Sequence, residues 1–466
     1  MKMVGLSVGT AVMENSRSAP EPTYRPNLIV LLTDDQRWDA VGCMGNPIVK
    51  TPEMDRLARE GTLFTKSFVT SAVCAASRAS IFTGQYERTH GCNFNKGPLS
   101  RRHLQRSYPM LLRETGYETA FVGKYGVGDA GEREIEADEV FDAYYGFYGQ
   151  GKYFPNGEDG QHLTQLMLED AEDFFDKRDA GRPFCLSISF KAPHSGVGYL
   201  ELTPDPALRD LYEDVQIPLP DTAKAAYFEA LPEFLQKSNA RYNYWELRYS
   251  TPEKYQEIMR DYYRLITGVD VVLGRLRASL EKRGLADNTV IVFLSDNGEM
   301  TGDYMLGGKE LLYDASIRVP MIVYDPRAPE RARGQHCGRL ALNIDVAPTL
   351  LDYAGIQAPD CMQGRSLVPL VRGETPTWRE SFFCENDFCV ESQYYPRIEG
   401  VRTERWKYVR YPEIEPVYEQ LFDLDADPQE VNDLARDERG TGVLQSLREK
   451  CDRYTRQLDA ARSNTN

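Results

Sequence analysis

The chain has 466 residues, of which 41% are hydrophobic and 27% charged, and its formal net charge is -16. This length and composition allow a large buried core and more than one domain. The acidic balance excludes a general affinity for nucleic acids or anionic membranes, which need a basic surface, and no apolar run in the sequence is as long as a membrane span. An anionic substrate therefore needs a local positive site.

The segment 1–24 is predicted to be a disordered leader. Its apolar stretch is short and is interrupted by Gly, Ser and Thr, which makes a poor hydrophobic region for a signal peptide. A trimmed export signal is the alternative. The nine cysteines form no CxxC pair and no regular framework, so their spacing does not indicate a compartment.

Short apolar runs rich in β-branched residues alternate with helical patterns along most of the chain. Strands are expected at 27–33, 118–123, 183–190, 289–295 and 319–324. Helices are expected between them, including 51–61, 108–116 and 262–284, each of which ends at a glycine, as a helix C-cap often does. This alternation predicts an α/β fold with a large, mostly parallel sheet sandwiched by helices.

The pattern changes after the segment 362–374. The segments 400–411 and 421–435 predict a smaller C-terminal antiparallel sheet with a closing helix. We therefore place a domain boundary near residue 373. The chain is divided into the leader 1–24, a main domain 25–373 and a C-terminal subdomain 374–466.

Charged or polar side chains follow four of the predicted strands directly. They are Asp34 and Asp35 after the first strand, Lys124 after the second, Lys191 and His194 after the third, and Asp296 and Asn297 after the fourth. Each piece alone is more often a turn, a helix cap or a solvated side chain, so the prediction rests on their joint occurrence. Because ligands of an open α/β sheet bind beyond the carboxyl ends of its strands, we expect these groups to meet in one place.

The chemistry of this group predicts a cation site for an oxyanion substrate. Three carboxylates and an amide oxygen form a hard, oxygen-only site that suits Ca²⁺ or Mg²⁺. The donors around it, Lys124, His194 and also Lys309, suit a tetrahedral oxyanion, either sulfate or phosphate.

The stretch 69–86 places Cys74 at the start of a predicted helix and Arg78 one turn further on. The free N–H groups and the dipole of a helix N-terminus stabilise an anion, so a plain thiolate nucleophile is one interpretation of Cys74. A thiolate is, however, a poor partner for a hard cation such as Ca²⁺. The site calls for an oxygen nucleophile where the sequence has sulfur.

The segment CAASRASIFTG (74–84) resembles the sulfatase signature Cys-x-Pro/Ala-x-Arg followed by Thr-Gly, in which the cysteine is oxidised to formylglycine. Further similar segments cover most of the chain: 26–39, 295–299, 307–323, 344–356, 400–411 and 421–435. The chain thus resembles the formylglycine-dependent sulfatases of the alkaline-phosphatase-like superfamily. The resemblance implies that 25–373 is the catalytic domain and that formylglycine-generating or radical maturation chemistry acts on Cys74. It also implies an exported enzyme, with a cytoplasmic one as the alternative because the leader is weak.

The resemblance also implies a role for each matching residue. Ca²⁺ would be held by Asp34, Asp35, Asp296, Asn297 and the modified Cys74. Arg78 would hold the formylglycine hydroxyls, Lys124 and Lys309 would bind the sulfate oxygens, and His194 would protonate the leaving alcohol.

One position departs from the family pattern. The segment GKYGVG (123–128) has Gly126 where relatives have a histidine that releases the sulfate from the enzyme. Three explanations are open: another residue, with His90 the nearest candidate, takes the role; the second half-reaction is slow; or the glycine makes room for a larger substrate. We favour the first and third explanations over inactivity because the other matching residues are present.

A sulfated carbohydrate is the predicted substrate. The aromatic segments 141–154 and 241–249 resemble insertions, whose rings are expected mainly to pack against the body, with stacking on sugars as the alternative. The basic run 100–106 is either a solvated helix face or a site for further sulfates. Two other functions are considered: a phosphonate monoester or phosphodiester hydrolase, and a non-catalytic binder of sulfated glycans.

Overall fold

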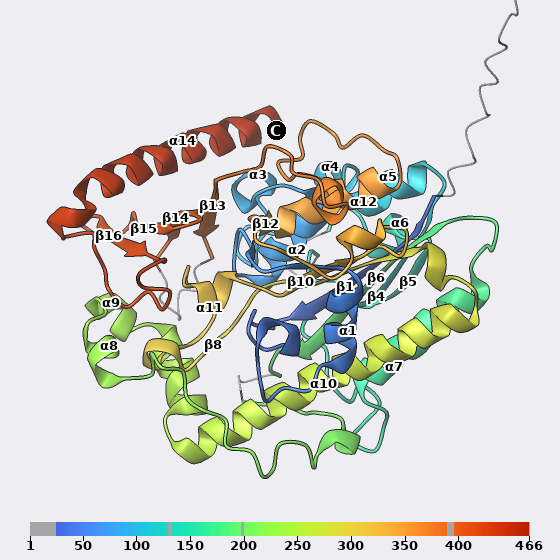
Figure 1. Ribbon diagram of the computed structural model, residues 1–466, viewed down its shortest axis with the longest axis horizontal. Coiled ribbons are helices and arrows are strands. Elements are labelled where there is room, and N and C mark those ends of the chain that lie inside the picture. The colour runs from blue at the N-terminus through green and yellow to red at the C-terminus, as the bar shows by residue number, and fades with distance from the viewer. Residues whose placement is uncertain (1–24, 129–132, 197–199, 389–395, 466) are drawn as a thin grey trace, which may run out of the picture.

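The computed structural model describes residues 25–128, 133–196, 200–388 and 396–465, so the predicted leader 1–24 lies outside it. Its centre is an eight-stranded sheet with the order β11-β2-β10-β7-β1-β6-β4-β5. Figure 1 shows β1, β4, β5 and β6 of this sheet in the middle of the molecule. The strands are β1 (Asn27–Asp34), β2 (Thr62–Phe64), β4 (Glu118–Lys124), β5 (Ala143–Phe147), β6 (Phe184–Pro193), β7 (Thr289–Ser295), β10 (Met321–Tyr324) and β11 (Gln335–Cys337).

The sheet is mostly parallel, as predicted. The central strand β1 pairs in parallel with β6 and β7, and β4 pairs in parallel with β6 and β5. The strand β10 runs antiparallel to its two neighbours, β7 and β2. All eight residues of β1 are buried, which explains its continuous apolar run: a strand covered on both faces has no polar side.

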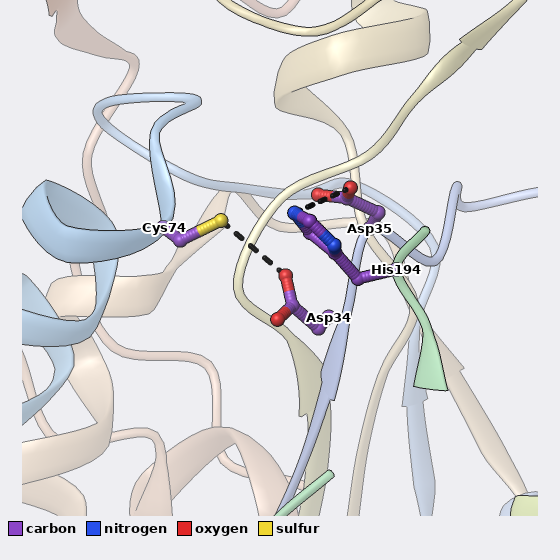
Figure 2. Close-up of side chains that lie close together, drawn as sticks. All are labelled: Asp34, Asp35, Cys74 and His194. Atoms are coloured by element: carbon purple, nitrogen blue, oxygen red, sulfur yellow. Dashed lines mark hydrogen bonds and ion pairs between the residues drawn. The ribbon is translucent and has the colours of Figure 1, made fainter. Parts of the chain in front are cut away.

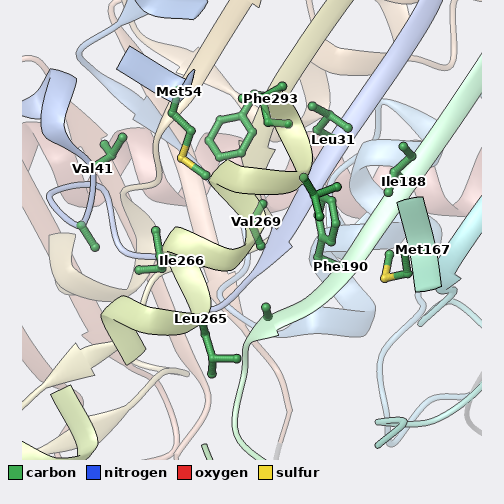
Figure 3. Packing of buried hydrophobic residues seen from close by; sticks show 14 of the residues in the cluster. Leu31, Val41, Met54, Met167, Ile188, Phe190, Leu265, Ile266, Val269 and Phe293 are labelled. Atoms are coloured by element: carbon green, nitrogen blue, oxygen red, sulfur yellow. The ribbon is translucent and has the colours of Figure 1, made fainter. Parts of the chain in front are cut away.

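Helices cover both faces of the sheet (Figure 1). One face packs against α1 (Pro52–Glu60), α7 (Leu163–Lys177) and α10 (Pro252–Lys282), and the other against α2 (Cys74–Thr83), α5 (Tyr108–Glu114) and α12 (Val346–Tyr353). Figure 3 shows Ile266 and Val269 of α10 in the same core as Leu31 and Phe293 of the sheet. The predicted helix 262–284 begins earlier than expected, at Pro252, where the Thr251 side chain accepts a hydrogen bond from the N–H of Lys254.

The aromatic segment 141–154 is not an insertion, which corrects the interpretation from the sequence. Residues 143–147 form β5 at the edge of the main sheet, because aromatic residues suit a half-buried strand. The rings of Phe141, Tyr144 and Tyr148 pack around Tyr125. The second aromatic segment lies in a π-helix, Ala240–Tyr249. The geometry therefore favours packing as the main role of these rings.

The C-terminal region contains the predicted antiparallel sheet and closing helix. The strands β13 (Ser381–Asn386), β14 (Ile398–Thr403), β15 (Trp406–Tyr411) and β16 (Tyr418–Asp423) pair in chain order, and α14 (Thr441–Thr465) lies beside them (Figure 1). The boundary near residue 373 falls between α13 (Val368–Val371) and β13, and it stays a prediction. Within the described part of the chain, no helix combines the length and the apolar character needed to cross a membrane.

A buried ion pair joins the start of the C-terminal region to the main domain. Both guanidinium end groups of Arg379 donate to the carboxylate of Asp345, at 2.5 and 2.6 Å, and the Asp345 side chain has no exposed surface. The backbone N–H groups of Leu342 and Arg365 also donate to Asp345, which stands just before α12. This carboxylate therefore anchors three separate segments.

We expect Asp345→Ala to lower the free energy of unfolding by about 3 to 5 kcal/mol, because it leaves a buried guanidinium without its carboxylate. Urea unfolding followed by fluorescence measures the effect. Asp360→Ala, at an exposed aspartate, is the matched control and should change stability by no more than about 0.5 kcal/mol. Equal unfolding midpoints for the two variants would contradict this assignment.

Candidate active site

The predicted strand-end residues meet at the carboxyl ends of the central strands. Asp34 ends β1 and Lys124 ends β4, while Asp296 and Asn297 follow β7 directly. Cys74, the first residue of α2, faces Asp34, and its thiol lies 3.3 Å from a carboxylate oxygen (Figure 2). Residues far apart in the sequence thus form one buried cluster.

The backbone conformation of Asp35 directs its side chain into this cluster. Its φ angle is +69°, in the left-handed region, which Asp tolerates better than most residues. Its backbone N–H donates to Asp296 at 3.2 Å, and the side-chain amide of Asn297 donates to its carboxylate at 2.5 Å. The strained turn therefore has hydrogen bonds that hold it in place, as expected for strain at a functional site.

Three cations neutralise the three carboxylates. Lys124 Nζ lies 2.5 Å from Asp34, Lys309 Nζ lies 2.5 Å from Asp35, and Arg78 Nε lies 2.8 Å from Asp296. Lys309 follows β9 (Gly307–Gly308) and also contacts the Cys74 sulfur at 2.8 Å. These contacts place Arg78, Lys124 and Lys309 in one cluster with the carboxylates, and the roles expected of them stay predictions.

The carboxylates differ in their affinity for a proton. Burial raises the pKa of Asp34, but Lys124, with His194 and Arg78, more than offsets this and holds that pKa well below its usual value. Burial and the neighbouring Asp34 instead raise the pKa of Asp296 to about 6. The same cluster thus holds one carboxylate whose pKa is lowered and one whose pKa is raised.

The surroundings of Cys74 favour its protonated thiol form. Burial and the nearby Asp34 raise its pKa well above the usual value, although Lys124 and Lys309 act in the opposite direction. This direction argues against the interpretation of Cys74 as a plain thiolate at a helix N-terminus, because loss of solvation opposes the effect of the helix dipole. A buried, protonated thiol is a weak nucleophile.

The cluster also has the composition of a cation site. Asp34, Asp35, Cys74 and His194 each offer one ligand atom within 4.8 Å of the others (Figure 2). The Oδ1 atom of Asn297 is buried and has no hydrogen-bond partner among the described residues. A buried amide oxygen without a donor is costly, so its unused lone pairs indicate a ligand of positive charge.

The space beside Gly126 is filled by Arg78. Gly126 has a φ angle of +75°, and a Cβ atom built on it would lie 2.5 Å from Cδ of Arg78. Arg78 is fully buried and donates from Nη1 to the backbone oxygen of Lys124 and to Ser189, at 2.7 and 2.5 Å. The glycine thus makes room for the arginine, which argues against the explanation that it makes room for a larger substrate.

His90 was suggested as a replacement for the family histidine that releases sulfate, and that role requires contact with the residue at position 74. The contacts of its ring are with other residues. Its Nε2 atom lies 3.0 Å from the Ser80 hydroxyl, and its Nδ1 atom accepts from the backbone N–H of Cys92 at 3.0 Å. Both ring nitrogens are thus engaged away from Asp34 and Cys74. Its role as a replacement for the family histidine gains no support from these contacts and stays a prediction.

Two residues of the site were not found from the sequence. Gln150 Oε1 accepts a hydrogen bond from Lys124 Nζ at 2.7 Å, and the Tyr153 hydroxyl donates to the backbone oxygen of His194 at 2.6 Å. Both lie in the glycine-rich end of the segment 141–154, which has no periodic pattern and no polar group directly after a strand. Only the pairing of β5 with β4 indicates that this segment lies beside Lys124.

Comparisons with known proteins decide the family. A family model described as Sulfatase matches residues 26–356. The chain belongs to the sulfatase family. A second model, described as N-sulphoglucosamine sulphohydrolase, C-terminal, matches residues 302–457 of this sulfatase.

Individual relatives agree with this assignment. An N-acetylglucosamine-6-O-sulfatase of Bacteroides thetaiotaomicron is 31% identical over 477 residues, covering 89% of this chain and 83% of the relative. An N-acetylglucosamine-6-sulfatase of Homo sapiens is 29% identical over 483 residues, covering 89% of this sulfatase and 82% of the relative. The chain is therefore a sulfuric ester hydrolase, which leaves the non-catalytic binder without support.

Solved structures share the fold over nearly the whole chain. One, described as a complex with its substrate D-glucosamine-2-N,6-O-disulfate, has a TM-score of 0.80 and 26% identity, covering 94% of this sulfatase and 98% of that chain. The phosphonate monoester hydrolase of Agrobacterium radiobacter has a TM-score of 0.77 and 24% identity, covering 95% and 96%. The second likeness shows a shared fold alone.

We expect Gly126→Ala to lower kcat/KM for 4-nitrophenyl sulfate by about 10²-fold, because the new Cβ displaces Arg78 from Asp296. Gly355→Ala is the matched control: this glycine has a φ angle of +72°, but no atom of the described residues beyond its chain neighbours lies within 4 Å of the added Cβ. Backbone strain should lower the free energy of unfolding of this control by about 1 to 2 kcal/mol, and the control should keep its activity. Wild-type kcat/KM in Gly126→Ala would refute the steric argument.

Proposed function

We propose that this sulfatase removes O-sulfate from a carbohydrate, with 6-O-sulfated N-acetylglucosamine as the first candidate substrate. The observation that carries the proposal is the buried cluster of three carboxylates and three cations around Cys74. It occurs in a chain that matches an N-acetylglucosamine-6-O-sulfatase at 31% identity over 89% of its length. The similar structure described as a complex with a disulfated glucosamine supports the same substrate class.

A divalent cation fits the cluster. We assign as donor atoms the carboxylate oxygens of Asp34 and Asp35, which belong to the cluster of ligand atoms, that of Asp296, which contacts the backbone of Asp35, and the unpartnered amide oxygen of Asn297. These oxygens form a hard set. Arg78, Lys124 and Lys309 already balance the three carboxylates, so a divalent cation would leave the site positive. That surplus suits an anionic sulfate ester, and we propose Ca²⁺, with Mg²⁺ as the alternative.

We propose that the residue at position 74 acts as formylglycine. When they are present, its hydrated aldehyde and Ca²⁺ supply the attacking oxygen and the charge that polarises the sulfate group. Cys74 is 1% exposed, so its oxidation requires a maturation enzyme that reaches the segment before α2 packs. Oxidation replaces the sulfur, which is a poor ligand for a hard cation, with oxygen, which is a good one.

The residues of the chain have distinct roles in this proposal. Lys124 and Lys309 bind sulfate oxygens with the ammonium protons that their carboxylate partners leave free. Arg78 forms ion pairs with Asp296 and Asp34, and from this position it holds the side chain of residue 74. In its imidazolium form, His194, whose Nε2 atom lies 3.6 Å from Asp35, gives a proton to the leaving alcohol oxygen, although burial lowers the pKa of its ring to about 3.

The substrate class is tested with matched esters. We expect the matured protein to release sulfate from 6-O-sulfated N-acetylglucosamine and from 4-nitrophenyl sulfate, at least about 10²-fold faster than it hydrolyses a 4-nitrophenyl phosphonate monoester. Cys74→Ala should lower kcat/KM by about 10³-fold or more, because the nucleophile is lost.

Cys185→Ala is the control for the nucleophile, since Cys185 is equally buried but lies within β6. It should keep most of the activity. Faster turnover of the phosphonate ester would favour the alternative function of a phosphonate monoester hydrolase.

The cation is tested by its removal. Dialysis against a chelator should abolish sulfate release, and Ca²⁺ should restore it. Asn297→Leu should raise the Ca²⁺ concentration for half-maximal activity by about 10-fold or more, because one oxygen ligand is lost.

Asn288→Ala, at the opposite end of β7, is the matched control and should not change the Ca²⁺ dependence. Direct Ca²⁺ binding by calorimetry gives a second readout. Full activity in chelator, or an unchanged Ca²⁺ dependence in Asn297→Leu, would reject this cation site.

A further inference from the structure

The tautomer of His194 is determined by its contact with the next residue. His194 follows β6 directly, and its Nδ1 atom lies 2.6 Å from the backbone oxygen of Ser195. A carbonyl oxygen only accepts hydrogen bonds, so Nδ1 carries the proton of this bond. The second ring nitrogen, Nε2, faces Asp35 and the cluster (Figure 2). Nε2 is therefore the atom that exchanges protons with a substrate.

The same Ser195 oxygen has a second donor. The ammonium group of Lys191 donates to it at 2.9 Å, and Lys191 is 1% exposed. No carboxylate lies within ion-pair distance of Lys191 among the residues that the structure describes. Burial, with the neighbouring charge of Lys124, lowers the pKa of Lys191 to about 8, although Asp34 and Asp35 act in the opposite direction. Because burial of an ammonium group without a close carboxylate is unfavourable, an apolar side chain would pack more favourably at this position. The charge therefore indicates a role at the Ser195 oxygen.

Tyr153 binds the backbone of the same segment, residues 194–195, through a different oxygen. Its hydroxyl donates to the backbone oxygen of His194 at 2.6 Å, and its ring lies under Lys191, with Nζ 5.0 Å from the ring centroid. The ring also stacks on His162, with centroids 5.2 Å apart and planes 14° from parallel. The Nε2 atom of His162 contacts the backbone oxygen of Thr203 at 3.0 Å. Tyr153 is thus held rigidly while it binds the backbone of His194.

We propose that Lys191 and Tyr153 are positioning residues that hold the His194 ring with Nε2 aimed at the leaving oxygen of the substrate. Lys191 holds the oxygen to which the ring itself is bonded, and Tyr153 holds the backbone from which the ring projects. With Nδ1–H bonded to Ser195, Nε2 carries a proton only in the imidazolium form of His194, which takes that proton up from solvent. As the S–O bond of the ester breaks, its electron pair stays on the leaving oxygen, the Nε2 proton passes to that oxygen, and His194 is left as neutral imidazole. This inference rests on the sulfate ester hydrolysis proposed above.

The proposal predicts a dependence on the leaving group. A sugar alkoxide is a poor leaving group and needs a proton as the bond breaks, whereas 4-nitrophenolate is stable without one. Displacement of His194 should therefore slow the sugar ester far more than the aryl ester. A general loss of folding or of sulfate binding would slow both substrates alike.

The test compares Lys191→Met, Tyr153→Phe and His194→Ala on the matured full chain with two substrates, 6-O-sulfated N-acetylglucosamine and 4-nitrophenyl sulfate. We expect kcat for the sugar sulfate to fall by about 10- to 100-fold in Lys191→Met and Tyr153→Phe, while kcat for the aryl sulfate falls by less than about threefold and KM is unchanged for both. Lys177→Met, an exposed lysine of α7, is the matched control and should match the wild type.

Double variants test whether Lys191 acts through His194. If it does, Lys191→Met adds no further loss to His194→Ala on the sugar sulfate, because the histidine is already gone. Tyr153→Phe keeps the ring under Lys191 and removes only the hydroxyl, so it carries the test if Lys191→Met does not fold. Melting temperatures identify a variant that has lost stability.

Three results would overturn the inference. These are equal losses on the two substrates, a raised KM that marks Lys191 as a direct sulfate ligand, and losses that multiply in the Lys191→Met, His194→Ala double variant. A wild-type protein that releases no sulfate from either ester overturns the proposed function and this inference with it. Normal wild-type activity with any of the three results overturns the inference alone.

Discussion

Three carboxylates buried side by side at the ends of β1 and β7 are the constraint on which the site depends. Each buried charge costs several kcal/mol unless it is paired, and like charges at this distance repel one another. Arg78, Lys124 and Lys309 supply the compensation, and they come from α2, β4 and the segment after β9. The order of the strands in the sheet is what brings these segments together. The site is therefore a property of the whole α/β domain and not of one motif.

The rule that strand ends meet was enough to place most of the site from the sequence. Asp34, Lys124 and Asp296 follow apolar runs directly, and parallel strands bring such residues to one edge. Gln150 and Tyr153 could not be placed in this way, since they reach the site through an edge strand and an irregular segment. The fit of Gly126 to Arg78 was also hidden, because it depends on the distance between β4 and α2 and not on any local pattern.

The chemistry at position 74 links these features. A hard oxygen site surrounds a thiol that burial keeps protonated, and neither property suits catalysis while sulfur stays there. An oxygen-bearing side chain at the same position would be a ligand for the cation and a nucleophile at once. On the opposite side, the turn after β6 holds an imidazole with one nitrogen bonded to the backbone and the other facing the cluster. In this proposal the nucleophile at position 74 and the proton donor for the leaving alcohol lie on opposite sides of one site.

Peptide mass spectrometry of residues 69–88 is the most direct test of this account. It should be applied to protein from cells that also produce a formylglycine-generating enzyme, in preparations whose turnover has been measured. We predict a mass lower by about 18 daltons at Cys74, from the replacement of CH₂–SH by CHO, and a modified fraction that rises in proportion to activity. Full turnover by protein in which Cys74 is an unmodified thiol would contradict the account.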